Sequence, residues 1–374
     1  MRIAILSDLH LGYTRFESDS YSQAERAILD ASSRSDLILC AGDIFDVKIP
    51  KLETLMRAVE IFNKSKVPVA AIHGNHERRT KDTTNPVQLL SASTSMILLH
   101  GKDFIFEKDG RTVQVFGMGS VPEEIAEAAL KSLMKERYQP KEGALRILMI
   151  HQTIKELISG SGDEELSLEY LETLPFDLVV DGHIHETITR NDGKFLIPGS
   201  TVITQLKDSE TAPKGYFLYD TETRKSEFIP IDSRKFFYEK MKFADADETT
   251  IRDVVAKKIT ELRAQSPDSL IAIKIEGTLK KGLASSDIQL DSFDNVFIEN
   301  NLDSQSLLAR LDKIKEMRQT ALSVRELALK ELAKKTEESV TMFDSSELFE
   351  KLVLGVDETI AYLEERNKKE TAEK

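Results

Sequence analysis

Five short polar segments recur along the first half of this sequence, and each directly follows an apolar run of β-strand length. Every segment contains an Asp, Asn or His of the kind that binds metal ions. Side chains at the carboxyl ends of neighbouring strands meet at one edge of an α/β sheet. The pattern therefore predicts an α/β fold in which separate strands build one site. The segments are SDLH (residues 7–10), GDIFD (42–46), GNHE (74–77), MIHQ (149–152) and GHIH (182–185).

The residue types in these segments suit a pair of divalent cations. Hydrolases that cleave phosphate esters at neutral pH use two cations a few Å apart, which acidify a water and screen the phosphate. Such a pair needs a bridging carboxylate, for which Asp43 is the natural candidate, while neutral imidazoles complete the coordination. Asp8 and His10 lie two residues apart, and His183 and His185 repeat that spacing. The segments predict a two-metal hydrolase.

The distribution of histidine supports this prediction. The chain has seven histidines, and five of them lie in the segments: His10, His76, His151, His183 and His185. Any one of them alone could be an ordinary core or surface histidine, but the ordered set favours a metal site. Asn75 offers a neutral carbonyl oxygen beside them. We expect His73 and His100, which lie outside the set, to be ordinary buried or surface residues.

Length and composition describe a globular protein of more than one domain. A chain of 374 residues with 40% hydrophobic and 31% charged residues predicts two or three domains. The longest apolar runs are strand-sized, so we expect no membrane span. The first six residues begin a buried strand and do not resemble a secretory signal. The single cysteine, Cys40, indicates a small buried side chain in a reducing, cytoplasmic compartment.

Net charge alone does not decide whether the chain binds nucleic acid. The formal net charge of −13 and the acidic pI near 5.2 describe the average, whereas binding depends on the local potential near the site. Arg78, Arg79 and Lys81 directly follow the GNHE segment and could contact a phosphate backbone. They could equally form a solvated loop.

Residues 1–230 alternate between strand and helix patterns. Apolar runs that end in Gly, Asp or His are separated by amphipathic stretches at 21–32, 52–65 and 86–95, which indicates βαβ units. Residues 231–301 read as a small α+β domain, with strands at 235–243, 269–276 and 295–299 and a helix at 248–264. The segment 302–366 is charged and amphipathic with few large apolar residues, so it either docks on a partner or forms a self-packed helical hairpin. Residues 367–374 predict a disordered tail.

The order D-x-H, G-D-x-x-D, G-N-H-E, a lone H and G-H-x-H resembles the calcineurin-like metallophosphoesterase superfamily. Within it, the chain is most similar to the archaeal DNA double-strand-break repair nucleases. These are the counterparts of bacterial SbcD and of the eukaryotic meiotic-recombination nuclease. The stretch 197–220, IPGSTVITQLKDSETAPKGYFLYD, resembles that family's PGS element and the PKG-aromatic strand after it. The resemblance implies a four-layer sandwich of two sheets flanked by helices, a capping domain at 231–301 that contacts DNA, and a C-terminal helical segment.

The resemblance also implies an activity and partners. These are Mn²⁺-dependent exo- and endonuclease action on DNA, an SMC-like coiled-coil ATPase gripped by residues 302–366, and a homodimer formed through helices near the third motif. Leu89 and Leu90 are candidates for the dimer contact, although they could equally be core residues. One metal would be bound by Asp8, His10, Asp43 and His185. The other would be bound by Asp43, Asn75, His151 and His183. His76, which is adjacent to a ligand but is not one, would act as an acid on the departing sugar oxygen or stabilise the transition state. Taken alone, the residue types would also admit Fe²⁺ or Zn²⁺.

Several alternatives remain open from the sequence. Asp46 stands where some relatives carry a histidine, and we expect it to orient a ligand histidine or cap a turn. A protein phosphatase usually carries an arginine after the second Asp of G-D-x-x-D, but this chain has Val47. A hydrolase of small or cyclic phosphodiesters would need neither the region after Asp303 nor the basic residues beside the site. A scaffold that has lost its metals is disfavoured, because every ligand position is occupied. The capping domain could also be only a stabilising accessory.

Overall fold

The computed structural model describes residues 1–80, 83–157 and 165–303, together with residues 347, 351, 355, 359, 360, 362 and 363. The predictions for Lys81, for nearly all of the segment 302–366 and for the tail 367–374 lie outside the described residues. The described chain divides into two compact units. The first comprises Met1–Lys240, Val255–Lys274 and Ser292–Glu299; the second comprises Met241–Val254, Ile275–Asp291 and the described residues from Asn300 onward.

One six-stranded sheet carries the first three motifs. Its order is β12-β11-β1-β2-β3-β4, in which β1 to β4 are parallel and β11 is antiparallel to both of its neighbours. The strands are β1 Arg2–Leu6, β2 Leu37–Ala41, β3 Val69–Ile72, β4 Ile97–Leu98, β11 Gly215–Asp220 and β12 Lys225–Pro230. The helices packed against it are α1 Glu17–Arg34, α2 Leu52–Phe62 and α3 Pro86–Ser93.

A second six-stranded sheet carries the last two motifs. Its order is β5-β6-β7-β8-β10-β9. The strands are β5 Lys102–Lys108, β6 Arg111–Met118, β7 Leu145–Ile150, β8 Leu178–Asp181, β9 Ile188–Arg190 and β10 Phe195–Ile197. The helices packed against it are α4 Ala126–Arg137 and α5 Leu168–Glu172. Short 3-10 helices are η1 Thr14–Phe16, η2 Glu123–Ile125, η3 Lys155–Leu157, η4 Asn191–Gly193, η5 Asp208–Thr211 and η6 Ser285–Asp287.

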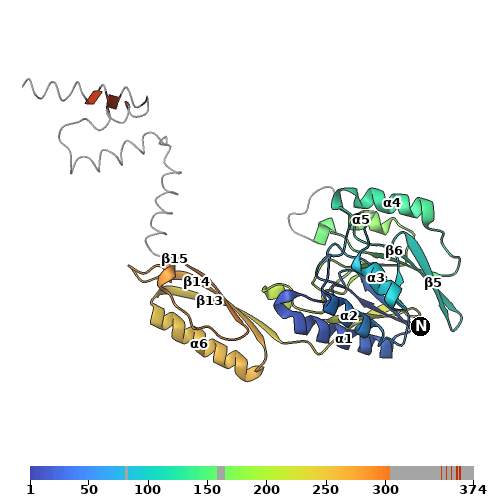
Figure 1. Ribbon diagram of the computed structural model, residues 1–374, viewed down its shortest axis with the longest axis horizontal. Coiled ribbons are helices and arrows are strands. Elements are labelled where there is room, and N and C mark those ends of the chain that lie inside the picture. The colour runs from blue at the N-terminus through green and yellow to red at the C-terminus, as the bar shows by residue number, and fades with distance from the viewer. Residues whose placement is uncertain are drawn as a thin grey trace, which may run out of the picture. The chain divides into compact units, whose positions relative to one another are not determined.

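The two sheets pack face to face, with helices covering both outer faces. Along β1, Ile3 and Ile5 enter the core between the sheets, whereas Ala4 and Leu6 face the helices. A strand buried on both faces needs apolar residues at each buried position, which explains the continuous run IAIL at residues 3–6. Figure 1 shows α1 and α2 on one side of the sheets and α4 and α5 on the other. The predicted four-layer sandwich is confirmed.

A smaller three-stranded sheet follows the sandwich, in the order β13-β14-β15. Its strands are β13 Phe236–Ala246, β14 Leu270–Leu279 and β15 Val296–Asp303, and its helix is α6 Glu248–Gln265. All four predicted elements of this region are present. Within the first unit, Phe236, Leu270 and Ala272 form an apolar cluster with Phe16 and Val202. The first-unit residues of β13 and β14 therefore pack against segments that follow β1 and β10.

Helix α3 has one buried leucine, Leu90, and one exposed leucine, Leu89. Asn85 and Gln88 form a capping box at the start of this helix, which fixes where it begins. Leu90 is only 1% exposed and belongs to the core, so its prediction as a dimer contact is wrong; the neighbouring Leu89 is 47% exposed.

Cys40 is fully buried, as predicted. None of the helices in the described part of the chain is both long and apolar enough to cross a bilayer.

Candidate metal centre

All five sequence segments meet at the carboxyl ends of strands from both sheets. The loops after β1, β2 and β3 come from the first sheet, and those after β7 and β8 come from the second. Backbone hydrogen bonds tie the loops together, since Asp8 N donates to Gly42 O at 3.0 Å and His10 N donates to Asp43 O at 3.0 Å. The site residues are Asp8, His10, Asp43, Asn75, His76, His151, His183 and His185.

Four of these residues adopt left-handed backbone conformations. The φ angles are 53° at Asp8, 45° at His10, 46° at Asp43 and 76° at His183. For a residue with a Cβ atom this region costs about 1–2 kcal/mol, and residues held there concentrate at functional sites. The strained loops turn the four side chains toward a common point.

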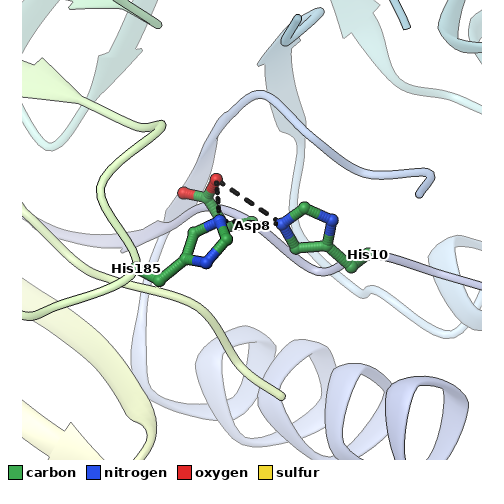
Figure 2. A group of neighbouring side chains, drawn as sticks. All are labelled: Asp8, His10 and His185. Carbon is green, nitrogen blue, oxygen red and sulfur yellow. Dashed lines mark hydrogen bonds and ion pairs between the residues drawn. The ribbon is translucent and has the colours of Figure 1, made fainter. Parts of the chain in front are cut away.

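A first group of donors consists of Asp8, His10 and His185, drawn in Figure 2. The Oδ1 atom of Asp8 lies 3.9 Å from His10 Nε2 and 3.7 Å from His185 Nε2, and the two imidazole nitrogens are 3.1 Å apart. Asp8 is fully buried, and neither of its carboxylate oxygens has a hydrogen-bond partner among the described residues. Burial raises the pKa of Asp8 to about 6. A cation between these three side chains would satisfy both the carboxylate and the facing lone pairs.

Asp46 orients the imidazole of His10. Its Oδ1 atom lies 3.2 Å from His10 Nδ1, and because a carboxylate only accepts, Nδ1 carries the proton and Nε2 keeps its lone pair. This contact is the orienting role expected for Asp46. Burial, followed by the neighbouring His10, lowers the pKa of His185 to about 2, which keeps that ring in the neutral form that binds metals.

A second group of donors consists of Asn75, His151 and His183. The Oδ1 atom of Asn75 lies 3.0 Å from His151 Nε2 and 2.9 Å from His183 Nδ1. The other nitrogen of His151, Nδ1, donates to the carbonyl oxygen of Ala41 at 2.7 Å, so Nε2 faces the site. An amide oxygen and two imidazole nitrogens thus converge as a second candidate cation site.

Asp43 lies between the two groups. One carboxylate oxygen of Asp43 lies within 4.8 Å of donor atoms of Asp8 and His151. A carboxylate oxygen of Asp43 also lies within 4.8 Å of donor atoms of His10 and His76. The distance from its Oδ2 atom to His151 Nε2 is 3.4 Å. Burial acts to raise the pKa of Asp43, but His151, His10 and His76 together lower it. An ionised carboxylate between two donor groups is what a bridging ligand requires.

His76 lies at the mouth of the site, where its side chain is 37% exposed. Its Nδ1 atom donates to the backbone oxygen of Asp46 at 2.6 Å, and its backbone N donates to Asp43 Oδ1 at 3.0 Å. With Nδ1 used in this way, Nε2 is the nitrogen left for chemistry, and it lies 3.9 Å from Asp43 Oδ2. His76 is therefore placed both at the edge of the donor cluster and in contact with solvent.

Two residues that support the site, Glu77 and Thr204, were not predicted from the sequence. Glu77 is fully buried and accepts hydrogen bonds from Phe45 N at 2.6 Å and Gly74 N at 2.7 Å, which joins the second and third motif loops. Burial and the nearby Asp43 raise the pKa of Glu77 to about 8. Thr204, which follows the PGS element, has its Oγ1 atom 2.5 Å from His185 Nδ1. The only sequence signal for these residues was their place within or just after a motif.

An open cavity of about 470 Å³ gives access to the donors. It is lined by Asp43, Asn75, His76, Leu157, His183, Ile184, His185, Glu186, Ile188, Gln205 and Lys207. Arg78 is half-buried, with Nη1 3.5 Å from Ser120 Oγ, and Arg79 is exposed. Neither arginine lines the cavity.

Comparison with known proteins identifies the family. Residues 1–187, half of the chain, match the family described as calcineurin-like phosphoesterase. The chain belongs to the calcineurin-like phosphoesterase family. The matched region contains every residue of the donor cluster, so the prediction of a metallophosphoesterase is confirmed. Members of this family bind divalent metals, and the donor groups described above are candidate sites for them.

Curated relatives of this phosphoesterase are archaeal DNA double-strand break repair proteins named Mre11. The protein from Methanocaldococcus jannaschii is 25% identical over 80% of this chain and 87% of the relative. The protein from Archaeoglobus fulgidus is 24% identical over 63% and 60% of the two chains, and that from Methanosarcina mazei is 26% identical over 77% and 47%. The chain thus spans less than two thirds of the length of the last two relatives.

Proposed function

We propose that this phosphoesterase is a Mn²⁺-dependent DNA exo- and endonuclease that acts in double-strand-break repair. The observation that carries the proposal is the convergence of two donor groups on the single carboxylate of Asp43. The named relatives support DNA as the substrate. The alternative is a phosphodiesterase that acts on small or cyclic nucleotides.

The donor geometry suggests how the residues divide the work. We assign one Mn²⁺ to Asp8, His10, Asp43 and His185, and the other to Asp43, Asn75, His151 and His183. When bound, the two ions would acidify a water and screen the charge of the phosphate. In its imidazolium form, His76 would donate the Nε2 proton to the departing sugar oxygen and keep the Nδ1 proton on the Asp46 carbonyl. Such proton donation contributes roughly 10²–10⁴ in rate.

The basic residues near the third motif are candidate DNA contacts. Arg78 and Arg79 follow His76 by two and three residues, and Lys81 lies just beyond them. Arginine and lysine side chains beside a phosphodiesterase site supply the sequence-independent part of DNA affinity. We propose that they hold the strand whose phosphate enters the cavity.

A substrate panel tests the proposed activity. Metal-free protein is incubated with single-stranded DNA, hairpin DNA, a cyclic nucleotide and a phosphomonoester, with and without Mn²⁺. We expect Mn²⁺-dependent cleavage of both DNA substrates and little of the others. Asp43→Ala should abolish cleavage and most metal binding, because both donor groups lose their shared ligand. Cleavage of the cyclic nucleotide alone would establish the alternative, and two ions retained by Asp43→Ala would refute the bridge.

We also propose that the protein forms a homodimer through an exposed apolar patch. The patch consists of Val47, Ile49, Leu52 and Met56, which are 45%, 74%, 79% and 67% exposed, together with Leu89 on the adjoining helix α3. Leu52 and Met56 are four residues apart on α2 and so share one face. Several large apolar side chains exposed together are typical of an interaction surface.

The remaining proposals concern the domains and a partner. We retain 1–230 as the nuclease domain, 231–301 as a DNA-contacting capping domain, 302–366 as the segment that binds an SMC-like coiled-coil ATPase, and 367–374 as the tail. An amphipathic segment with little core of its own fits helix-in-groove binding. A DNA-associated, cytoplasmic location accompanies this function, and the buried thiol of Cys40 agrees with it.

A further inference from the structure

A series of polar groups, half-buried at His185 and buried at its far end, extends away from the donor cluster. Thr204 Oγ1 lies 2.5 Å from His185 Nδ1 and 2.8 Å from Glu210 Oε1. The other carboxylate oxygen of Glu210 lies 2.5 Å from Lys214 Nζ. Glu210 and Lys214 are only 2% and 6% exposed. These residues belong to the segment between β10 and β11, outside the five motifs.

Lys214, at the far end of this series of polar groups, is also held in place. Lys214 Nζ donates to Ser200 Oγ at 3.0 Å, while the hydroxyl of Ser200 donates to Val202 O at 2.8 Å. The backbone N of Ser200 donates in turn to the carbonyl oxygen of His185 at 3.1 Å. The segment therefore contacts His185 through both its side chain and its backbone.

Counting donors assigns the proton of His185. A carboxylate can only accept, so the single hydroxyl proton of Thr204 is directed to Glu210. The hydroxyl oxygen can then only accept from His185, and Nδ1 must carry the ring proton. Nε2 is left with its lone pair, and this is the atom that faces Asp8 and His10 (Figure 2).

The hydroxyl of Thr204 without Glu210 would not hold the ring proton of His185 on Nδ1. The hydroxyl of a threonine rotates and can donate or accept, so Thr204 alone would allow either tautomer of His185. The carboxylate of Glu210 removes one choice, and the ammonium of Lys214 keeps that carboxylate paired in its buried position. His10 and His151 need no such relay, because each donates directly to an acceptor: Asp46 Oδ1 and Ala41 O.

We propose that Glu210 and Lys214 are positioning residues that act through Thr204 to hold the proton of His185 on Nδ1 and direct Nε2 into the donor cluster. This inference rests on the proposed function, in which His185 binds a metal ion. Outer contacts of this kind typically contribute 10–100-fold to metal affinity.

The first experiment compares two conservative changes at Thr204. Thr204→Val keeps the shape of the side chain and removes the hydroxyl, whereas Thr204→Ser keeps the hydroxyl. Nitrogen NMR of ¹⁵N-histidine-labelled, chelator-treated protein reports the tautomer of His185 without any metal. We expect the parent and Thr204→Ser to show the Nδ1-protonated form and Thr204→Val to show a mixture. Calorimetry with Mn²⁺ should show one of two sites weakened 10–100-fold in Thr204→Val only.

The second experiment asks whether Glu210 acts through Thr204. Glu210→Gln should shift the His185 tautomer and weaken the same Mn²⁺ site, and it should add nothing in the Thr204→Val background. Because this change leaves the ammonium of Lys214 buried, the double variant Glu210→Gln with Lys214→Met, which removes both charges, provides a second test. It should show the same tautomer mixture. Asp208→Asn, at an exposed carboxylate on the same short helix η5, is the matched control and should leave both readouts at parent values.

The outcomes separate this inference from the proposed function. A parent protein that binds no Mn²⁺ but shows a pure Nδ1-protonated His185 would refute the metal site and leave the relay intact. A parent that binds two Mn²⁺ ions, with Thr204→Val unchanged in tautomer and affinity, would overturn the relay. If Glu210→Gln weakened Mn²⁺ binding as much in the Thr204→Val background as in the parent, Glu210 would act by a route other than Thr204.

Discussion

A methyl group added at Gly182 tests how closely the two sheets must approach behind the donor cluster. Gly182 follows β8, and a Cβ atom there would lie 2.1 Å from Ala41 O and 2.5 Å from His151 Nδ1. These are the two atoms of the hydrogen bond that orients His151. To reach ordinary contact at 3.4 Å, they would have to move by about 1.3 and 0.9 Å.

The expected cost of Gly182→Ala follows from two effects. Overpacking in a close-packed interior costs about 1–3 kcal/mol, and breaking a buried hydrogen bond costs a further 1–3 kcal/mol, roughly. We expect the free energy of unfolding of the metal-free protein to fall by about 3 kcal/mol. For a domain of this size that lowers Tm by roughly 6–12 °C. Mn²⁺ affinity should fall about 10–100-fold, because the orienting contact of a ligand is lost.

Thermal unfolding of chelated protein and calorimetry with Mn²⁺ measure both effects. Gly143→Ala is the control, because the same methyl group would meet nothing within 4 Å there. Its φ of +74° is unfavourable for alanine, so the control should lose about 1–2 kcal/mol and keep full metal affinity. A Gly182→Ala protein that melts within a degree of the parent and binds Mn²⁺ equally well would show that the sheets need not approach so closely at this position.

Three further predictions concern chemistry, assembly and the partner. His76→Ser should keep the parent's metal content and DNA affinity while turnover falls roughly 10²–10⁴-fold; loss of metal would make His76 a ligand. Leu52→Asp, at a side chain 79% exposed, should halve the mass in light scattering without lowering Tm, and an unchanged mass would exclude the patch. A chain ending at Asp303, the last residue of β15, should fold and cut single-stranded DNA but should not co-purify with the ATPase. The double variant Leu348→Glu with Leu352→Glu, at two positions outside the described residues, should behave in the same way. Retained association in both proteins would favour the alternative that 302–366 forms a self-packed hairpin.

The motifs were predictable because each is local in sequence. An apolar run such as RIAIL identifies its own strand, and the polar residue after it must lie at the strand's end. Asp8 and His10 could therefore be assigned to the site before their neighbours were known. The four layers came instead from the resemblance to a known family, and the structure agrees with it, since residues 3–6 of β1 are apolar and buried on both faces.

The supports of the site were not predictable in this way. The contact between His185 and Thr204 depends on how the chain returns after β10, and the contact between Glu77 and Phe45 depends on the approach of two loops. Neither is visible in a local pattern. The burial of Leu90 is similar, because its spacing fits both a core face and an exposed face. Only the packing of α3 beside α2 distinguishes it from Leu89.

The position of β1 in its sheet has a consequence during protein synthesis. β1 pairs with β2 on one side and antiparallel with β11 on the other, with Arg2 opposite Asp220. At a synthesis rate of 5–20 residues per second, roughly 10–40 s pass before β11 follows β1 out of the ribosome. Throughout that interval one edge of β1 has no neighbour, and an apolar strand with an open edge is a template for pairing with other chains. The growing chain, and not the finished protein, is therefore the form in which aggregation is the greater danger.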